Sequence, residues 1–290
     1  YKRFKAVKKG DEDKIAQSLA KMMTEDRTLK VVNDSANRQS LIYGIGDQHL
    51  DIVMNKLKER YKVDVELSKP KVPFRETIRK NADVEGKHKK QSGGHGQYGH
   101  VKMRFEPSGD LETPYEFEQV VVGGAVPKNY FPAVEKGLRD SVTKGVLAGY
   151  PMVGLKATLY DGSYHPVDSS EMAFKTAASI AYKNGIPKAD PVILEPIGTL
   201  KAYMPDEKMG DIMGDITKRR GRVLGMGPAE DKMQEIVAEV PMAEMGDFAT
   251  TLRSVTHGRG HFSLEFTRYE EAPANVAEKV IEDAKAHAEE

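Results

Sequence analysis

The sequence predicts an α+β protein built of three domains. A strand–helix–strand–strand–helix–strand order is indicated over residues 1–69, and the same order is indicated again over residues 192–290. The intervening residues 70–191 depart from this order and are bounded on both sides by prolines, which are typical of junctions. A chain of 290 residues is also too long for one ordinary small core, which favours several small domains.

The first domain is indicated by short strands that alternate with amphipathic helices. Acidic residues 11–13 favour a helix start, because carboxylates stabilise the positive end of a helix. Ile15, Leu19 and Met22 then recur at helical spacing. The expected elements are a strand at 4–7, a helix from 11, strands at 29–32 and 40–43, a helix from Asp47 and a strand within 61–67. This is the order of a ferredoxin-like βαββαβ domain over residues 1–69.

The last domain, residues 192–290, repeats this order without repeating the sequence. The expected elements are an extended segment at 192–203, a helix from 205–207, strands at 222–226 and 234–240, a helix from Asp247, a strand at 261–266 and a terminal helix from Pro273. Phe262, Leu264 and Phe266 alternate as a strand with one buried face requires. A second ferredoxin-like domain, followed by a C-terminal helix, is therefore expected.

The middle domain, residues 70–191, is expected to be α+β with a different order. Its sequence indicates a Gly-rich loop, a helix carrying Val134 and Leu138, a strand at 153–160 and a long helix after Asp168. The flanking ferredoxin-like domains and this central domain together give the predicted fold class.

The composition excludes several classes of protein. Lys plus Arg and Asp plus Glu both total 44, so nucleic-acid binding must rest on local clusters of charge. The chain has no cysteine, which excludes disulfides and thiolate metal sites. No stretch approaches the roughly 18 to 20 apolar residues of a membrane helix, so we expect no membrane contact. The absence of cysteine is compatible with a reducing cytosol, and a cytoplasmic location is expected. The chain begins at Tyr1 without a signal pattern, as expected for an internal cut in a longer protein.

Residues 86–104 contain the densest functional signal. Five basic residues occur there with no acidic residue, namely Lys87, Lys89, Lys90, Lys102 and Arg104. Lysines neutralise phosphates, and Tyr98 is suited to stacking on an unpaired base. The glycines of this segment allow another backbone to approach closely. RNA binding is one interpretation, and a solvated hairpin whose charges maintain solubility is the other.

Three histidines in the same segment raise the question of a metal site. His88, His95 and His100 match no zinc spacing, and no carboxylate or cysteine stands among them. No metal site is predicted.

The stretch ahead of the long helix contains a second signal. The dipeptide Asp161-Gly162 is typical of a turn, and Asp168 three residues before Glu171 resembles a capping box. His165 is then expected in an exposed loop just before a helix N-terminus, whose free amides suit an RNA phosphate. A well-capped turn without a function is the alternative.

Ser163, His165 and Asp168 have the residue types of a hydrolytic triad. The serine does not lie in a G-x-S-x-G nucleophile elbow, so no catalytic residue is predicted.

The third signal is a run of cations at the end of a predicted helix. Its members are Lys218, Arg219, Arg220 and Arg222. Cations stabilise a helix C-terminus, and Gly221 is expected to be the C′ residue that ends the helix. Neither a G-x-x-x-x-G-K-[ST] loop nor an N-K-x-D motif occurs, so this chain is not expected to bind GTP.

Taken together, these motifs resemble the C-terminal three domains of bacterial elongation factor G or of a close paralogue. The matching strings, in order, are GDQHLDIVMNKLKERY, VPFRETI, DVEGKHKKQSGGHGQYGHV, GGAVPKNYFPAVEKG, LYDGSYHPVDSSEMAFK, DPVILEPI, GDIMGDITKRRGRVLGM and LRSVTHGRGHF. They cover almost the whole chain.

The resemblance implies domain III at 1–69, an elongated domain IV with a ribosomal-protein-like fold at 70–191, and domain V at 192–290. It implies that two loops at the tip of domain IV contact the tRNA–mRNA duplex in the A site of the decoding centre, with His165 at the extreme tip. The tip residues would be Gln91, Ser92, Gly93, Gly94, His95, Gly96, Gln97, Tyr98, Asp161, Gly162, Ser163, Tyr164 and His165. The candidates for ribosomal RNA contact are Lys87, Lys89, Lys90, Lys218, Arg219, Arg220 and Arg222.

The resemblance further implies the ribosome-binding part of a translational GTPase that promotes tRNA–mRNA translocation. No cofactor is expected in this chain, because GTP and magnesium would bind only in an N-terminal domain outside it. The implied partners are the ribosome, through 16S and 23S ribosomal RNA and ribosomal proteins, together with tRNA and mRNA, and a monomer is expected. The family commonly has arginine where His95 stands and glutamate where Pro166 stands. These differences leave a diverged paralogue, acting in ribosome recycling or ribosome protection, as the alternative.

Overall fold

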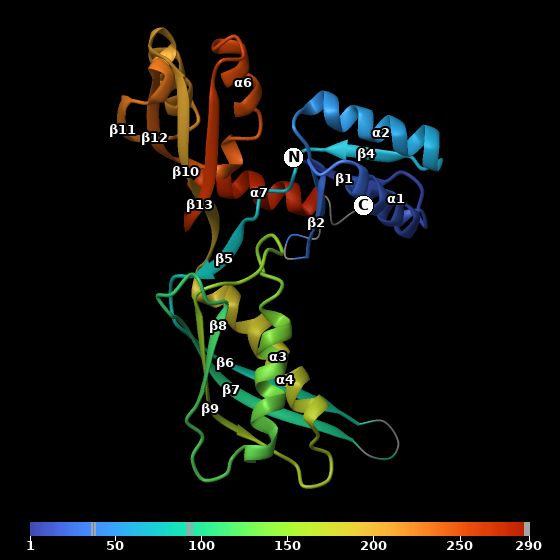
Figure 1. Ribbon diagram of the computed structural model, residues 1–290. Coiled ribbons are helices and arrows are strands. Elements are labelled where there is room, and N and C mark those ends of the chain that lie inside the picture. The colour runs from blue at the N-terminus through green and yellow to red at the C-terminus, as the bar shows by residue number, and fades with distance from the viewer. Residues whose placement is uncertain (36, 38, 92–93, 95, 287–290) are drawn as a thin grey trace. The chain divides into compact units, whose positions relative to one another are not determined.

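The computed structural model describes residues 1–35, 37, 39–91, 94 and 96–286 (Figure 1). The chain forms two compact units. One contains residues 1–73 and 198–265, and the other contains residues 74–197 together with the residues from 266 onward. The α+β fold class predicted from the sequence is confirmed.

The N-terminal part of the first unit is a ferredoxin-like domain. Its elements are β1 (Lys2–Ala6), α1 (Glu12–Glu25), β2 (Lys30–Asp34), β3 (Gln39–Tyr43), α2 (Asp47–Tyr61) and β4 (Val65–Ser68). The strands form an antiparallel sheet in the order β2-β3-β1-β4. Ile15 and Leu19 of α1 and Leu50 and Leu57 of α2 belong to one buried core. The apolar faces predicted for both helices are therefore confirmed.

The second ferredoxin-like sheet has the same topology. Its elements are β10 (Pro191–Pro205), α5 (Met209–Lys218), β11 (Arg222–Pro228), β12 (Met233–Pro241), α6 (Phe248–Val255) and β13 (His261–Glu271). The strand order is β11-β12-β10-β13, and the core includes Leu200, Ile212, Ile216 and Phe248. A short 3-10 turn at Asp206–Lys208 precedes α5, so that helix begins later than the sequence indicates.

The end of α5 differs from the expectation for Gly221. The residue in the left-handed conformation is Arg220, with φ of 63°, and the Gly221 amide donates to the Ile216 carbonyl across the last turn. A Cβ on Gly221 would lie 2.5 Å from Ile216 Cγ2. Gly221 is therefore needed for close packing, and the prediction that it is the C′ residue is wrong.

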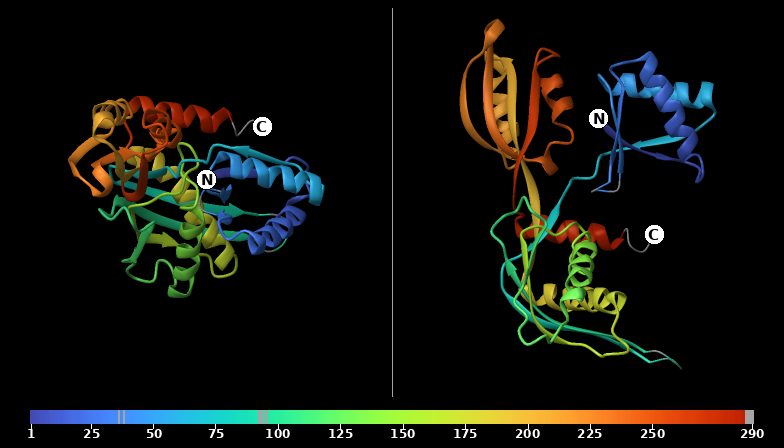
Figure 2. Two further views of the ribbon diagram at one scale, coloured as in Figure 1. Left: turned by 45° about the horizontal axis from the view of Figure 1, so that its top comes forward. Right: turned by 60° about the horizontal axis from the view of Figure 1, so that its bottom comes forward.

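The second unit contains the sheet of the central segment. Its elements are β5 (Arg75–Ile78), β6 (Ala82–Lys90), β7 (Gln97–Pro107), β8 (Tyr115–Gln119), α3 (Phe131–Ser141), β9 (Leu155–Ser163), α4 (Glu171–Gly185) and α7 (Ala274–Ala286). The sheet order is β6-β7-β9-β8, in which only the β8–β9 pair is parallel, and β5 pairs with the start of β10. Helices α3 and α4 lie on one face of this sheet (Figures 1 and 2), where Phe105, Leu138 and Phe174 are buried.

The Gly-rich loop expected within residues 86–104 is mostly a pair of strands. β6 and β7 pair from Ala82 opposite Phe105 to Lys90 opposite Gln97, so only a short connection joins them. Two of the glycines lie in these strands, directly beneath α4. A Cβ on Gly86 would lie 2.1 Å from the Ala177 oxygen, and one on Gly99 would lie 2.4 Å from the Ala173 oxygen. These glycines allow close packing of helix on sheet, which has the same sequence signature as a flexible loop.

The turn predicted at Asp161-Gly162 is also wrong, because both residues lie within β9. Asp161 pairs with Lys102 and Leu159 pairs with Met103, which leaves Tyr160 as the extra residue of a β-bulge. Beyond the bulge, Ser163 pairs with His100. The strand therefore continues to the end of the sheet at which the β6–β7 hairpin closes.

Candidate nucleic-acid interface

The end of the β6–β7 hairpin is joined by hydrogen bonds to the segment between β9 and α4. The Gly96 amide donates to Asp168 Oδ1 at 3.0 Å, and the Tyr98 amide donates to the Asp168 carbonyl at 2.8 Å. Ser169 Oγ donates to the Tyr98 carbonyl at 2.9 Å. The structure thus brings together the two segments that were predicted from separate motifs.

Not every predicted tip residue is described. Ser92, Gly93 and His95 lie outside the described residues. The remaining tip residues occupy the hairpin end, the last residues of β9 and the segment after it. They are Gln91, Gly94, Gly96, Gln97, Tyr98, Asp161, Gly162, Ser163, Tyr164 and His165.

The N-cap of α4 is Ser170, which corrects the capping box predicted at Asp168. Ser170 Oγ accepts from the Ala173 amide at 3.2 Å. Asp168 lies two residues earlier and uses its carboxylate on Gly96 instead. Because Ser170 and Asp168 are both favoured N-cap residues, the sequence alone did not separate them.

His165 is half exposed, and its ring is held by its own loop. Nδ1 accepts from the Val167 amide at 3.3 Å and from the Asp168 amide at 3.1 Å. Asp168 Oδ2 lies 3.4 Å from the same nitrogen, and the side chain of His165 is 50% exposed. The His165 amide donates to Ser169 Oγ at 2.9 Å, which closes the loop. The expectation of an exposed histidine just before α4 is confirmed.

Ser163 belongs to a second hydrogen-bond network, on the face of the sheet away from the helices. Ser163 Oγ lies 2.6 Å from Tyr98 Oη and 2.7 Å from His100 Nδ1. His100 Nε2 lies 2.7 Å from Glu85 Oε1, although the two are not aligned as a hydrogen bond. Ser163 is therefore bonded to His100 rather than to His165, so Ser163, His165 and Asp168 do not form a catalytic triad.

The basic residues of the hairpin divide into two groups. Lys102 pairs with Asp161 at 2.8 Å and Arg104 pairs with Asp83 at 2.7 Å. The hydrogen bond from Lys102 lowers the pKa of the Asp161 carboxyl below its ordinary value, so that pair stays charged. The second group is Lys87, Lys89 and Lys90, for which the described residues provide no ion pair.

These three lysines lie towards the hairpin end, beside Tyr98. Lys87 Nζ is 5.8 Å from the centre of the Tyr98 ring. An aromatic ring next to ammonium groups is suited to RNA, in which a base and a phosphate alternate. The paired cations lie farther along β7, where Arg104 is 5.8 Å from the Tyr160 ring.

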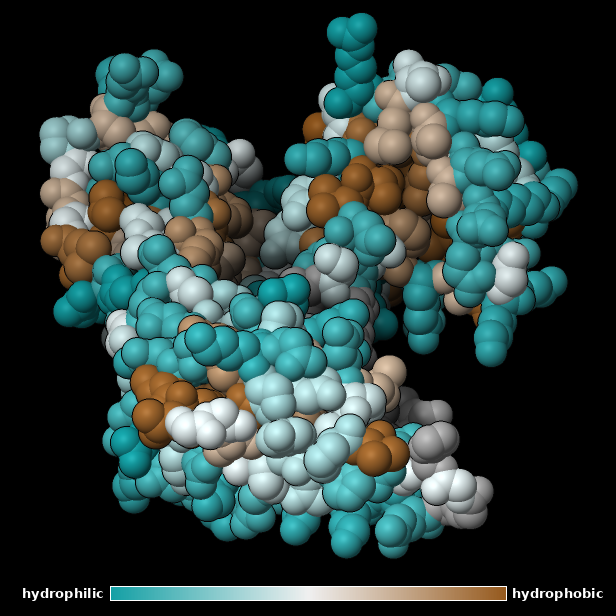
Figure 3. Space-filling view, turned by 90° about the horizontal axis from the view of Figure 1, so that it is seen from below, coloured by the Kyte–Doolittle hydropathy of each residue, from teal (hydrophilic) through white to brown (hydrophobic). Residues whose placement is uncertain are grey.

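The end of the second unit also exposes apolar side chains. The face seen from below in Figure 3 is mainly hydrophilic, with separate hydrophobic spots. Exposed apolar residues of this unit include Val122, Val167 and Met172, which are 82%, 65% and 65% exposed. Val122 belongs to the 120–126 loop, which sequence analysis did not single out as a site. Val126 of that loop packs close to Gly162, where a Cβ would lie 2.6 Å from Val126 Cγ2.

Three of the four cations at the end of α5 form ion pairs within their own domain. Arg219 is only 11% exposed, and its guanidinium pairs with Asp215 and Asp247. Arg220 pairs with Glu244, and Arg222 pairs with Glu239 at 2.7 Å. Lys218 is exposed, with no ion pair among the described residues. Of the four candidates, Lys218 is thus the most available to RNA.

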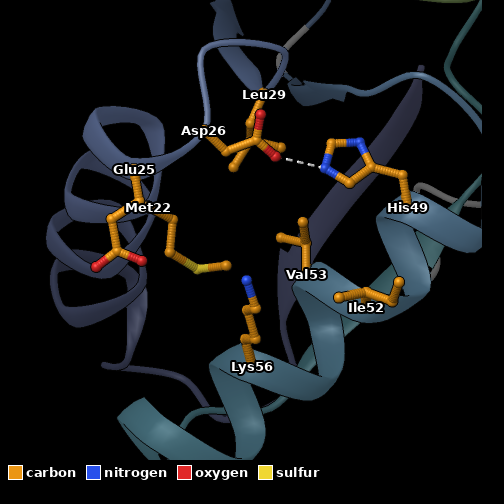
Figure 4. A pocket seen from close by; sticks show the side chains of 8 residues that line it. All are labelled: Met22, Glu25, Asp26, Leu29, His49, Ile52, Val53 and Lys56. Carbon is orange, nitrogen blue, oxygen red and sulfur yellow. Dashed lines mark hydrogen bonds and ion pairs between the residues drawn. The ribbon is translucent and has the colours of Figure 1, made fainter.

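A hollow lies between α1 and α2 of the N-terminal domain, as Figure 4 shows. In it His49 Nε2 lies 2.7 Å from Asp26 Oδ2, and His49 Nδ1 accepts from the Ile45 amide. Hydrogen bonds from Thr28, and then from His49, lower the pKa of Asp26 to about 2.

Among the described residues no three His, Cys, Asp or Glu side chains gather as metal ligands, and no helix is long and apolar enough to span a membrane.

Three family models match consecutive parts of the chain. Elongation factor G domain III matches residues 3–69, domain IV matches residues 70–190, and the elongation factor G C-terminus matches residues 192–280. An elongation factor G-like protein of Thermotoga maritima is 48% identical over 282 residues, which cover 97% of this chain and 41% of that protein.

A solved structure agrees with the sequence matches. A crystal structure of a protein from Thermus thermophilus has a TM-score of 0.88 and 42% sequence identity, covering 98% of this chain and 42% of that one. The present chain thus spans about two fifths of the length of both relatives. The three consecutive domain matches, together with the similarity to the Thermotoga maritima protein, show that this chain belongs to the elongation factor G family of translation factors.

Proposed function

We propose that this chain is the ribosome-binding part of a translational GTPase that promotes tRNA–mRNA translocation. In this proposal the end of the second unit enters the A site of the decoding centre and contacts the tRNA–mRNA duplex. The other domains contact 16S or 23S ribosomal RNA and ribosomal proteins, and the protein acts as a monomer. GTP and magnesium bind in a part of the protein outside this chain.

The observation that supports the proposal best is the hydrogen-bonded junction of the two predicted loops at one end of the sheet. That end presents His165, Tyr98 and three lysines without ion pairs among the described residues. A basic, aromatic and hydrogen-bonding surface on a rigid sheet suits a polyanionic partner. A rigid arm in the A site would oppose reverse movement of the duplex by steric exclusion.

The absence of cysteine makes a direct test possible, because one introduced thiol is unique. We would attach an iron chelate at Met172→Cys, in the exposed first turn of α4, and bind the chain to ribosomes that carry tRNA and mRNA. Hydroxyl radicals from the iron cleave nearby RNA. The matched control is Glu112→Cys, in the exposed segment that follows the other end of β7.

Cleavage of decoding-centre RNA from position 172, and not from position 112, is the expected result. Absence of that cleavage, or equal cleavage from both positions, would contradict the proposal. Loss of the decoding-centre signal at high ionic strength is expected as well, because phosphate contacts are screened by salt.

A further inference from the structure

The segment 165–169 makes more hydrogen bonds than are needed to start α4. Ser170 alone caps the helix. The side chains of Asp168 and Ser169 are therefore not needed to cap the helix. Both form hydrogen bonds with the β6–β7 hairpin instead. We name the five residues Gly96, Tyr98, His165, Asp168 and Ser169 the tip clamp.

The backbone of the clamp leaves little freedom at Gly96. A Cβ there would lie 2.9 Å from Asp168 Oδ2. A side chain at this position would push the carboxylate away and break its bond to the Gly96 amide. The glycine thus serves the contact between the two segments.

The same segment determines which nitrogen of His165 carries the proton. Nδ1 faces two amide donors, those of Val167 and Asp168, so it must supply a lone pair to both. A neutral ring then carries its proton on Nε2.

We propose that Asp168 and Ser169 are positioning residues that hold the two tip segments as one unit and hold the ring of His165 with Nδ1 turned to its own loop, so that Nε2–H donates to an acceptor oxygen of RNA. The inference rests on the proposed function for its RNA partner. Phosphate oxygens and ribose hydroxyls share the required acceptor chemistry. In this arrangement His165 supplies a directed hydrogen bond, and the positive charge comes from the lysines of β6.

The clamp itself is tested by amide hydrogen exchange on the 290-residue chain without ribosomes. Asp168→Ala removes the acceptor of the Gly96 amide, so exchange at Gly96 should become about tenfold faster. Asp168→Asn keeps a carbonyl oxygen in place and should largely restore protection. The control Asp140→Ala removes a carboxylate that pairs with Lys175 in the same unit, and it should leave Gly96 unchanged. Unchanged exchange at Gly96 in Asp168→Ala would overturn the clamp.

The state of His165 is tested by the nitrogen chemical shifts of its ring near neutral pH. A proton on Nε2 and none on Nδ1 is expected, and a proton on Nδ1 would contradict the inference. Two substitutions separate the roles of the two nitrogens. In His165→Asn, the side-chain oxygen replaces Nδ1 as an acceptor, but no donor replaces Nε2–H. In His165→Gln, the side-chain amide group replaces Nε2–H as a donor, but no acceptor replaces Nδ1 for the Val167 and Asp168 amides. His165→Asn should keep the Val167 and Asp168 amides protected, and His165→Gln should expose them.

The contact of His165 with RNA is tested by attaching the iron chelate at Met172→Cys in each variant and measuring the cleavage of ribosomal RNA. His165→Asn and Asp168→Ala should each weaken the decoding-centre signal about fivefold to tenfold, and Asp168→Asn should keep it. If exchange at Gly96 rises while cleavage is unchanged, the clamp is only structural and the inference fails. If the parent chain gives no cleavage at all, the proposed function fails whatever the exchange data show.

Discussion

The buried Glu76 carboxylate accepts a hydrogen bond from the Ala148 amide at 2.8 Å. Two further amides, those of Leu147 and Tyr150, donate to it at 2.9 and 3.1 Å. One side chain of β5 thus fixes the loop between α3 and β9. A Cβ on Gly145 of that loop would lie 2.2 Å from the carboxylate, so the space around it is filled.

Glu76→Gln is expected to destabilise the second unit by about 1–3 kcal/mol, the usual cost of an unsatisfied buried donor. The amide nitrogen of glutamine cannot accept, so one of the three backbone donors loses its partner. Urea unfolding measures the change. The control is Glu116→Gln on β8, which is exposed and should change stability by less than about 0.5 kcal/mol. Equal effects of the two substitutions would show that the amides of the loop do not depend on Glu76.

Glu76 should also give stability a distinct pH dependence. Burial raises the pKa of Glu76 above its ordinary value of 4.5, with the amide hydrogen bonds opposing the rise. The folded state therefore binds this proton more tightly than the unfolded state. Its contribution is fully present below pH 4.5 and is lost as pH rises through the raised folded pKa. The stability difference between the parent and Glu76→Gln should accordingly shrink as pH rises from about 4 to 7. A difference that grew over that range would contradict the raised pKa.

Two glycine-to-alanine substitutions should have opposite signs. Gly214 lies in α5 with no atom near its missing Cβ, so Gly214→Ala should stabilise by about 0.5–1 kcal/mol through helix propensity. Gly86→Ala should destabilise by about 1–3 kcal/mol, because its Cβ would meet the backbone of α4. Thermal unfolding of the two variants measures both effects. A stabilising Gly86→Ala would mean that α4 moves away from the sheet at little cost.

Arg219 and Lys218 are neighbours with different expected roles. The Arg219 guanidinium donates to Asp215, to the Glu244 carbonyl and to Asp247, which links α5 with the start of α6. Arg219→Ala should cost about 2 kcal/mol in stability, because it leaves partly buried carboxylate and carbonyl groups without a donor. Lys218→Ala should change stability by less than about 0.5 kcal/mol. Chemical denaturation distinguishes them, and similar costs for both would contradict a structural role that is specific to Arg219.

The three lysines of β6 that have no ion pair with any described residue should govern the salt dependence of RNA binding. Replacing Lys87, Lys89 and Lys90 with glutamine should reduce the slope of log affinity against log salt by about 0.7 for each phosphate that is no longer neutralised. The matched control replaces Lys102, Arg104 and Lys156, each of which already pairs with a carboxylate. Ribosome binding measured at several salt concentrations gives both slopes. A larger change in the control set would place the phosphate contacts farther along the sheet.

The sequence predicted the two ferredoxin-like domains well because their signals are periodic. Ile15, Leu19, Ile212 and Ile216 lie on the buried faces at the spacing of a helix, and all four are buried as expected. The central sheet was harder to predict. β5 and β8 were not expected, because a four-residue and a five-residue strand give too short a pattern to recognise.

The candidate site was predicted in part. His165 was placed correctly in an exposed segment before α4, since the helix signal behind it was strong. The pairing of Asp168 with Gly96 connects residues that are 72 positions apart, and no local pattern indicates such a contact. The sequence predicts a loop at Gly86 and Gly99, because glycine beneath a helix and glycine in a loop look the same in one sequence.

Because Tyr160 is an extra residue in β9, the side chains beyond it face the opposite side of the sheet from the one that the alternation before it would give them. Up to Leu159 the odd-numbered residues face the helices, whereas Asp161 and Ser163 face the opposite side with Lys102 and His100. If Tyr160 took the place opposite Lys102 instead of bulging, Asp161 would turn toward the apolar interior and Ser163 would lose its place opposite His100. The outer end of this strand should therefore tolerate exchanges of side chain far more readily than the insertion of a further residue.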